Sequence, residues 1–516
     1  MAKKISKTKK PRKNSYHKVT YAHEPRAKFI KRVTLYTFFT ALTIFLSVLI
    51  FYRAKGYTFT KNGRVEKRGI LLINSAPISS KIYIDGKDIG KKTDYKLEID
   101  EGSHNLRLEA NGYRTWEKNF SIKAEEVEWF YYPYLIPNSL VSKDILTNIP
   151  KKTYSSLNSD SKVIAVSKSG LSLAQSYIFE ELNLKEDDPA NISNTIIVPS
   201  QIFTRQADGS LGDIKFDKWS PNGDSIFLEH TFDDNKELIN LRVDAPAEST
   251  NLTNSVGVGI NQYRYDDKSK LYLNKNGELA IYNPVSLVKE QIIDIEVLDF
   301  NNFRNSKYVY SKTSKDAEKP GIQVLIKDDQ NSPKLVNTLF VGNPKDLDFQ
   351  YTANRRDYYL SISNLYNKEL IIYKNPLDSM DDNTKVSNPL FLSTFESMKS
   401  NQIKESIQGS PQPGTYIAIH LSENTLFIYN FEKESSQTFT LNNLKINDFS
   451  WIDSEHLQLK TTDEKIFYID YDGNYLNEIT STSQVFSYFI KSKNKTITIN
   501  EVQPGLDKIS EIKFKD

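Results

Sequence analysis

Residues 216–243 read FDKWSPNGDSIFLEHTFDDNKELINLRV. Two apolar segments are separated by Pro221-Asn222-Gly223, and a third follows the polar turn at Asp233-Asp234. Gly and Asn tolerate the positive φ that tight turns require, and short apolar runs between such turns are typical of strands. The stretch therefore predicts three antiparallel strands joined by two tight turns.

Related units recur through the C-terminal region. Residues 449–479, FSWIDSEHLQLKTTDEKIFYIDYDGNYLNEI, repeat the strand and turn order, and weaker echoes lie at 263–282, 349–373 and 415–441. Repeats of this length predict the blades of a β-propeller, because one blade cannot bury its faces alone. We expect six to eight blades in one closed ring over residues 138–516. Two smaller propellers or a sandwich would also accommodate these strands.

The segment WSPNGDSIFL, which begins at Trp219, resembles the W-S-P-D-G-x-x-[IL] signature of TolB-type β-propellers. The other matching residues are Ser220, Pro221, Gly223 and Ile226, with Asn222 in place of Asp. In the unit 449–479 only Trp451 and the strand pattern remain. Because Trp219 and Trp451 occupy equivalent places in two repeats, we interpret them as packing residues between blades rather than as a surface for ligand stacking.

Residues 69–122 predict a separate, compact β module. Its five expected strands are residues 69–74, 81–85, 95–99, 104–109 and 116–122. The turns between them are marked by Asp85-Gly86, Glu101-Gly102 and Asn111-Gly112, where Gly supplies positive φ. Five short strands in so few residues predict a small β-sandwich.

This module resembles the PEGA domain, a small surface-layer-associated β module. The matching residues are Ser75-Ala76-Pro77, residues 82–86, Gly90, Leu97, residues 101–104 and Gly112-Tyr113. The sequence departs from the family at Pro77-Ile78-Ser79-Ser80, at Thr93-Asp94 and at Glu101-Gly102, where the family has Pro-Glu-Gly-Ala, Thr-Pro and Pro-Gly. The resemblance implies an extracytoplasmic module of cell-envelope proteins and implies no catalytic residues.

Residues 33–52, VTLYTFFTALTIFLSVLIFY, are uncharged and lie between Arg32 and Arg53. A helix of this length spans roughly 30 Å, the thickness of a bilayer core. A buried core helix rarely has twenty uncharged residues with Arg directly before and after them. A cleaved signal peptide is not expected, because FYRAKG offers no small-x-small cleavage site. We therefore predict a transmembrane signal-anchor helix.

Residues 1–32 contain twelve Lys or Arg and one acid, Glu24, whereas the whole chain has a net charge of +3. The rest of the chain is therefore acidic, which argues against a nucleic-acid groove. The basic residues nearest the helix are balanced on its two sides, but the distal tail adds positive charge to the N-terminal side and favours a cytoplasmic N-terminus. We expect the tail to contact anionic lipid headgroups; a nucleic-acid arm is the alternative.

The sequence contains no Cys, which excludes disulfides, Cys-ligated zinc and thiol catalysis. No HExxH, P-loop, GxSxG or GxGxxG motif is found. The six His are scattered, and we interpret His104 as a surface residue beside a turn. We therefore predict no catalytic, cofactor-binding or metal-ligating residue and no cofactor.

Two acidic features were weighed as sites. Residues 470–474, DYDGN, have oxygen ligands, but Tyr475 and Ser481 stand where a calcium loop needs Gly and Glu, so we predict a hairpin turn. Asp233-Asp234 and Asp381-Asp382 indicate solvated loops. A glycosidase pair of carboxylates in the propeller stays open, since two carboxylates can come from distant blades.

The predicted order is a basic cytoplasmic tail (1–32), a transmembrane helix (33–52), a linker (53–68), a PEGA-like β-sandwich (69–137) and a propeller-like region (138–516). We expect a membrane-anchored, extracytoplasmic protein that binds surface proteins or cell-wall polysaccharide, or scaffolds them, without catalysis. One alternative is a surface carbohydrate-active or peptidase-like enzyme that uses carboxylates in the propeller funnel. The other is a purely structural spacer.

Overall fold

The computed structural model describes residues 26–54, 57–59, 65–170, 175–266, 268–302, 307–318, 320–328, 332–353, 357–377, 389–398, 403–405, 416–480 and 486–514. Contacts within the chain divide it into two compact units. Unit 1 draws on Met1–Ile73, Asp94–His104 and Asn119–Tyr131, and unit 2 on Asn74–Thr93, Asn105–Lys118 and Tyr132–Asp516.

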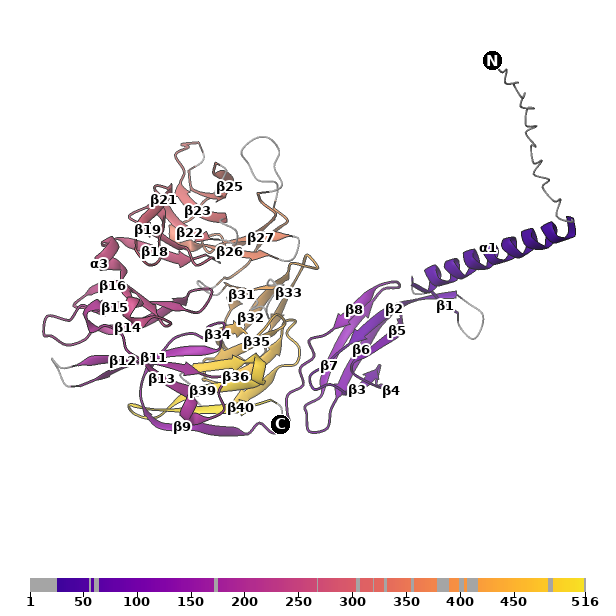
Figure 1. Ribbon diagram of the computed structural model, residues 1–516, viewed down its shortest axis with the longest axis horizontal. Helices are drawn as coiled ribbons and strands as arrows, with labels where there is room; N and C mark the ends of the chain where they lie inside the picture. Colours follow the sequence, from indigo (N-terminus) through magenta and orange to yellow (C-terminus); the bar gives the residue numbers. More distant parts are fainter. Residues whose placement is uncertain are drawn as a thin grey trace, which may run out of the picture. The chain divides into compact units, whose positions relative to one another are not determined.

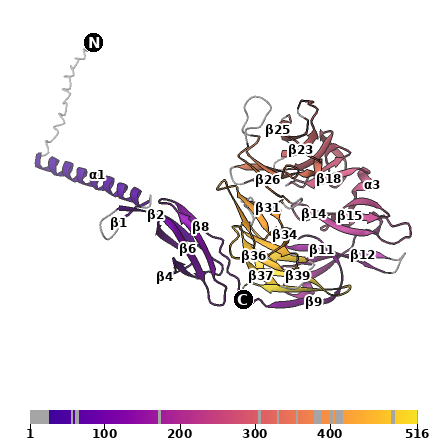
Figure 2. The ribbon, with the colours of Figure 1, turned by 180° about the vertical axis from the view of Figure 1, so that it is seen from behind.

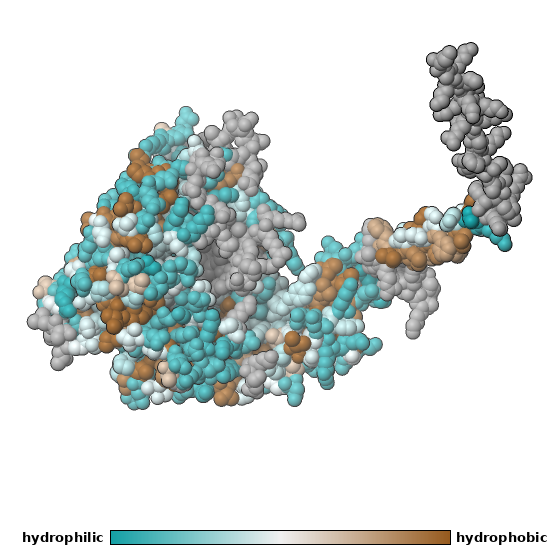
Figure 3. Space-filling view, viewed as in Figure 1, coloured by the Kyte–Doolittle hydropathy of each residue, from teal (hydrophilic) through white to brown (hydrophobic). Residues whose placement is uncertain are grey.

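Unit 1 contains one long apolar helix, α1 (Arg26–Ala54). Its segment Ile30–Tyr52 is long and apolar enough to cross a membrane, and none of it is buried. Figure 3 shows apolar side chains along this helix. The hydroxyl groups of Thr34, Thr37 and Thr43 each donate to the backbone carbonyl four residues earlier at 2.8–2.9 Å. These bonds satisfy the polar atoms of an otherwise apolar surface.

Two four-stranded sheets follow, as a small β-sandwich requires. The first has β1 (Tyr57–Phe59), β2 (Val65–Ile73) and β5 (Tyr95–Asp100) in the order β1-β2-β5, with β8 (Val127–Phe130) parallel to β2. The second has β3 (Lys81–Ile84), β4 (Lys87–Lys92), β6 (Gly102–Glu109) and β7 (Trp116–Ile122) in the order β4-β3-β6-β7.

The sequence missed three of these strands, of which β1 lies in the segment 53–68 that was predicted to be a linker. In β4, KDIGKK, every residue but one is exposed, so the apolar alternation that marks a strand is absent. Its pairing with β3 is directed by the turn Asp85-Gly86, in which both residues have positive φ (50° and 77°). The strand β8, VEWF, lies beyond the stretch in which strands were expected.

Eight four-stranded blades make up the remainder of the described chain, at the upper end of the predicted number. Blades 1 to 4 consist of β10 (Thr153–Tyr154), β11 (Lys162–Ser169), β12 (Ser176–Asn183), β13 (Ser193–Ile196); β14 (Asp213–Trp219), β15 (Ser225–Phe232), β16 (Asn235–Arg242), β17 (Thr250–Asn251); β18 (Ile260–Tyr265), β19 (Leu271–Lys275), β20 (Glu278–Tyr282), β21 (Lys289–Asp294); and β22 (Val297–Asn302), β23 (Lys307–Thr313), β24 (Ile322–Asp328), β25 (Lys334–Leu339).

Blades 5 to 8 consist of β26 (Leu347–Ala353), β27 (Tyr358–Asn364), β28 (Glu369–Lys374), β29 (Phe391–Thr394); β30 (Ile403–Glu405), β31 (Tyr416–Ser422), β32 (Thr425–Asn430), β33 (Ser435–Thr440); β34 (Ile446–Trp451), β35 (His456–Thr461), β36 (Ile466–Asp470), β37 (Asn477–Thr480); and β38 (Phe486–Ile490), β39 (Lys495–Gln503), β40 (Leu506–Lys513), β9 (Ser142–Pro150). Short helices α2 (Pro189–Ile192) and α3 (Leu252–Val256) lie in blades 1 and 2.

The ring is closed by strands from both ends of the propeller. β9 precedes blade 1 in the sequence but pairs with β40, with Ser142 opposite Ile512, and the two lie side by side in Figure 1. The view from behind shows β9 and β39 in this last blade (Figure 2). Closure removes the free sheet edges that an open array would leave.

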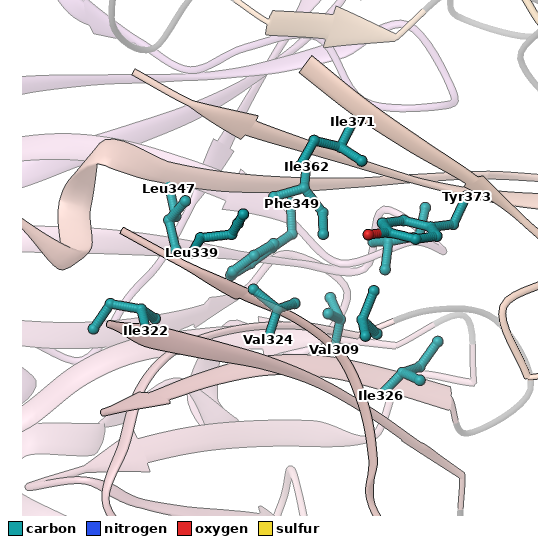
Figure 4. Packing of buried hydrophobic residues seen from close by; sticks show 12 residues of the cluster. Val309, Ile322, Val324, Ile326, Leu339, Leu347, Phe349, Ile362, Ile371 and Tyr373 are labelled. Carbon is teal, nitrogen blue, oxygen red and sulfur yellow. The ribbon is translucent and has the colours of Figure 1, made fainter. Parts of the chain in front are cut away.

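The hydrophobic core has one cluster at each of the eight junctions between successive blades, including the junction of blade 8 with blade 1. In the cluster between blades 4 and 5, Val309 and Val324 face Phe349 and Ile362, all at most 2% exposed (Figure 4). A core shared by every successive pair requires one closed ring, so the sandwich and the two smaller propellers are excluded.

The signature turn at the end of the first strand of a blade is built from hydrogen bonds rather than from one fixed residue. In blade 2, Ser220 Oγ accepts from Ser225 N at 3.0 Å, and Gly223 takes φ 74°. In blades 3 and 7, Asp266 and Asp453 each accept from two downstream backbone N–H groups at 2.8–3.0 Å. The turn therefore persists where the sequence signature does not.

The two Trp residues pack between blades, as predicted. Trp219 Nε1 donates to Ser156 O of blade 1 at 2.9 Å. Trp451 is 3% exposed and stacks on Tyr416 of blade 6, with 5.9 Å between ring centroids.

Candidate functional site

The first strand of each blade lies toward the centre of the ring. β10 contacts β14, β18 contacts β22, β22 contacts β26, and β30 contacts β34. The blades of a propeller are arranged around a central channel, and these first strands border it. Polar side chains on these strands therefore converge from several blades.

Three of these inner strands share an Asp-Phe pair. Phe300 of β22, Phe349 of β26 and Phe449 of β34 are at most 2% exposed. Because successive side chains of a strand point to opposite faces, the preceding residues Asp299, Asp348 and Asp448 point away from the core. Gln262-Tyr263 occupies the same place in β18. The repeat thus sets acidic and amide groups around the inner wall.

Strand β14 departs from this pattern. Its register with β15 shifts between Phe216 and Trp219, which leaves Asp217 and Lys218 in a β-bulge. Bulges re-aim side chains, and both of these residues are exposed. We name the inner-strand cluster after its six polar members, Asp217, Lys218, Gln262, Arg264, Asp299 and Asp348.

Hydrogen bonds fix part of the inner-strand cluster. Gln262 donates from Nε2 to Asp299 Oδ1 and accepts from Phe300 N at 3.1 Å. Arg264 Nε donates to Phe300 O at 3.2 Å. Both side chains of β18 are therefore held against β22 of the next blade.

The charges of the inner-strand cluster influence one another without forming ion pairs at Lys218. Desolvation by the surrounding wall and then the charge of Arg264 lower the pKa of Lys218, although Asp217, Asp348 and Asp299 oppose this shift. Desolvation also raises the pKa of Asp299, and Asp348 adds to that effect, whereas the hydrogen bond from Gln262 and the charge of Arg264 oppose it. Among the residues that the structure describes, neither Lys218 nor Arg264 lies within ion-pair distance of a carboxylate.

A second cluster of polar side chains within unit 2 is buried, and its members are paired with one another. This blade 7 cluster consists of Trp116, Lys118, Tyr132, His456 and Asp470. Trp116 Nε1 donates to Asp470 Oδ2 at 2.7 Å, and Lys118 forms an ion pair with Asp472. Trp116 and Asp470 are completely buried.

His456 must carry two ring protons in this arrangement. Nε2 lies 2.8 Å from Tyr132 O, which only accepts, and Nδ1 lies 2.8 Å from Asp453 Oδ1. Although burial opposes the charge, Asp453 and then Asp470 raise the pKa of His456 to about 9. Burial raises the pKa of Asp470 to about 8. The blade 7 cluster therefore holds a buried imidazolium whose charge is met by Asp453.

Of the acidic turns noted in the sequence, Asp233-Asp234 lies outside both clusters, whereas residues 470–474 contribute Asp470 to the blade 7 cluster. Asp233 and Asp234 form the β15–β16 turn with positive φ, and Asp233 accepts from Ala207 N at 2.6 Å. Asp470 and Gly473 form the predicted hairpin, with Gly473 N donating to Asp470 O at 3.0 Å. Asp381-Asp382 lie outside the described residues. No group of three His, Asp or Glu that could hold a metal occurs in the part of the chain that the structure describes.

The prediction for His104 was wrong in detail. It lies within β6 rather than beside a turn, is half-buried, and has Nε2 2.9 Å from Asp100 O. The strand begins earlier than expected because Gly102 and Ser103 already pair in the sheet.

Sequence reasoning assigned no site residue and missed the inner-strand cluster. One usable signal was the repeated Asp-Phe pair at 299, 348 and 448, which marks the first strand of a blade. No such signal exists for Lys218, because its place in a bulge depends on the pairing of β14 with β15.

The described elements define a class of protein in which an apolar N-terminal helix is followed by a small β-sandwich and an eight-bladed propeller. Residues 68–134 match the model of the PEGA domain, which confirms that resemblance. No curated protein matches the chain.

Several solved propellers are similar in fold. The C-terminal WD40 domain of Sif2 is 10% identical, with 73% of this chain and 99% of that chain covered and a TM-score of 0.39. BamB from Moraxella catarrhalis is 11% identical, with 72% and 100% covered and a TM-score of 0.42. An oligogalacturonate lyase in complex with manganese is 10% identical, with 73% and 99% covered and a TM-score of 0.38. The propeller assignment rests on the eight blades themselves.

Proposed function

We propose that this chain is a single-pass, membrane-anchored binding or scaffold protein of the cell envelope, with its β region outside the cytoplasm. Residues 33–52 span the bilayer, and the basic tail 1–32 contacts anionic headgroups on the cytoplasmic side. The ligand is a surface protein or cell-wall polysaccharide. The observation that supports binding is the inner-strand cluster, in which the exposed Lys218 and the half-buried Arg264 form no ion pair with a carboxylate among the described residues.

In the inner-strand cluster, the charge of Arg264 lowers the pKa of Lys218 while three carboxylates raise it. The charge of Asp348 raises the pKa of Asp299, and that of Arg264 lowers it. A PEGA domain beside an apolar helix supports a place in the envelope.

Orientation is tested with single cysteines, because the chain has none of its own. Ser6→Cys and Ser286→Cys, the latter exposed in blade 3, are labelled in intact cells with a membrane-impermeant maleimide. Labelling at position 286 alone is expected. Labelling at position 6 alone would place the propeller in the cytoplasm and refute the envelope proposal.

Binding is tested with the full chain in detergent, exposed to solubilised envelope proteins and wall polysaccharide. The double variant Lys218→Met/Asp348→Asn should lose the material that the wild type captures. Lys215→Met, on the same strand β14 but outside the inner-strand cluster, is the matched control and should retain it. Equal capture by all three proteins would count against this proposal.

One observation favours the enzymatic alternative. The raised pKa of Asp299 beside the carboxylate of Asp348 is the arrangement that a general acid and its partner need. Screening the full chain against polysaccharides and peptides at several pH values tests it. Turnover that disappears in Asp299→Asn and persists in Asp213→Asn would replace the non-catalytic proposal.

A further inference from the structure

Strand β8 and the residue after it leave a row of large apolar side chains at the surface of unit 1. Val127, Trp129 and Tyr131 are 41%, 54% and 52% exposed. They occupy alternate positions, so their side chains point to the same face of the sheet. The rings of Trp129 and Tyr131 pack edge to face, with 4.9 Å between their centroids. The row is therefore continuous rather than a set of isolated surface residues.

The neighbouring strand β2 extends this row into a patch. In the parallel pair, Ile70 lies opposite Val127 and Leu72 lies opposite Trp129. Both residues of β2 are half-buried, whereas Leu71 between them belongs to the core. We name this surface the β8 patch, and its members are Ile70, Leu72, Val127, Trp129 and Tyr131.

The other sheet of the same module has a polar surface instead. The alternate exposed positions of β7 hold Glu117, Asn119 and Ser121, as expected where one face of a sheet meets water. In the β8 patch, large apolar groups take the corresponding places. Contiguous exposed apolar surfaces of this kind mark sites of contact with proteins or membranes.

The chain keeps the β8 patch close to the end of the apolar helix. β1 begins three residues after α1 ends, and Tyr57 of β1 lies opposite Lys67 of β2. Ile70 follows Lys67 by three residues. From the maximum length of an extended chain and the spacing of paired strands, Ile70 lies within roughly 35 Å of Tyr52, where the apolar segment ends.

The composition of this region favours a lipid surface as the partner. Residues 53–68 contain six Lys or Arg and one acid, Glu66. Basic residues close to a bilayer are attracted to anionic headgroups. Trp and Tyr favour the boundary between hydrocarbon and headgroups, because their rings combine an apolar body with a polar edge. Charge and aromatic character therefore indicate the same partner, the bilayer that holds α1.

We propose that the β8 patch docks on the headgroup region of the membrane that α1 spans, with Trp129 and Tyr131 inserted among the lipids. This inference rests on the proposed membrane anchor and adds a second contact between the chain and the bilayer. Lys96 and Glu98 of β5, which are exposed on the same face, stay at the level of the headgroups. Docking fixes the orientation of this sheet relative to the membrane.

The test uses the full chain, which has no Cys of its own, reconstituted into vesicles of phosphatidylcholine and phosphatidylglycerol. Val127→Cys carries the environment-sensitive fluorophore NBD within the β8 patch. Ser121→Cys, exposed on β7 of the other sheet, is the matched control. Both variants are labelled before reconstitution, and a fraction of the lipid carries a doxyl quencher near its headgroup.

We expect the doxyl lipid to quench NBD at position 127 more strongly than at position 121, and the emission at position 127 to shift to the blue. Equal quenching at both positions, or none at position 127, would overturn the proposal. A blue shift that grows with the ratio of protein to lipid, without quenching by lipid, would identify a second copy of the chain as the occupant. A shift that requires added wall polysaccharide or envelope protein would identify that ligand, and either result would overturn docking on lipid.

Trp129 provides a test of the patch itself. In the labelled Val127→Cys chain, Trp129→Ser should lower the ratio of docked to undocked protein by about tenfold or more, because burial of one large aromatic side chain is worth at least one decade. Trp129→Phe should retain most of the quenching. Val285→Ser, which removes a similarly exposed apolar side chain in blade 3, is the control and should leave the quenching unchanged.

Quenching that survives Trp129→Ser undiminished would overturn the assignment of the β8 patch. If Trp129→Ser does not fold, which circular dichroism reveals, the comparison of positions 127 and 121 still decides the question.

Docking and the proposed function fail separately. A chain that floats with the vesicles but shows no quenching at position 127 would refute docking and leave the membrane anchor intact. A chain that does not float with the vesicles would refute the anchor and docking together. The orientation in cells does not affect this assay, because both leaflets contain the same lipids.

Discussion

The inner-strand cluster and the blade 7 cluster use the same kinds of side chain in opposite ways. Around blade 7, Asp470 is fully buried and bonded to Trp116, and His456 donates from both ring nitrogens. On the inner strands, Lys218 is exposed and unpaired among the described residues. One group of charges is satisfied by the protein, and the other is left for solvent or a ligand.

This difference separates a structural group from a binding group. A buried charge is stable only when hydrogen bonds or an opposite charge compensate for lost hydration, so blade 7 cannot exchange its partners without losing stability. An exposed charge has no such requirement. Substitutions should therefore affect stability at blade 7 and ligand binding at the inner strands.

The same substitution at two lysines tests this contrast most severely. Lys118→Met leaves the buried carboxylate of Asp472 without its cation, and removing one partner of a buried ion pair costs about 3–5 kcal/mol of unfolding free energy. Lys218→Met removes an amine that forms no ion pair among the described residues and should change the unfolding free energy by less than about 0.5 kcal/mol. Urea denaturation of both full-length variants, followed by Trp fluorescence, measures the difference. Similar losses would show that the two regions do not differ in role.

Much of the architecture was predictable because it is local. The turn at Pro221-Asn222-Gly223 and the apolar runs around it identify a blade without knowledge of its neighbours, and Asp85-Gly86 does the same for a hairpin of the PEGA domain. The apolar run at 33–52 predicts a helix of membrane-spanning length. Each of these signals requires only a few consecutive residues.

The two clusters were not predictable because they depend on long-range pairing. Trp116 and Asp470 are bonded although 354 residues separate them in sequence. Asp470 itself was predicted as part of a hairpin turn, and only the packing of its neighbours reveals that it is buried. Likewise, Lys218 and Asp348 come together only when the ring closes, and no local pattern encodes that closure.

The pH dependence of stability sharpens the comparison. The pKa of His456 is about 9 in the folded state against an ordinary value of 6.5, so its stabilisation is complete below pH 6.5 and is lost as the pH rises through 9. Linkage gives a loss of about 3 kcal/mol over this range. The raised pKa of Asp470 acts in the same direction, because its protonated form is favoured in the folded state.

Urea midpoints of the wild type at pH 6.5 and 9.5 measure this loss. In His456→Gln the midpoint should be lower at pH 6.5, and the decrease between the two pH values should be smaller. Lys218→Met is the control and should keep the dependence of the wild type. A wild-type midpoint that rises with pH would contradict the assignment of a buried imidazolium.

The smallest effect is expected at Asp299. Its pKa is raised by desolvation and by Asp348, so the folded state becomes less stable as the pH rises from the ordinary value of 3.8 through the raised one. Asp299→Asn removes this penalty and should leave the unfolding free energy at pH 7 equal to that of the wild type or higher by less than about 1 kcal/mol. Urea denaturation of the wild type and Asp299→Asn at pH 4 and pH 7 measures the difference in unfolding free energy. A clear loss at pH 7 would mean that Asp299 serves the fold, as Asp470 does, and would remove it from the inner binding group.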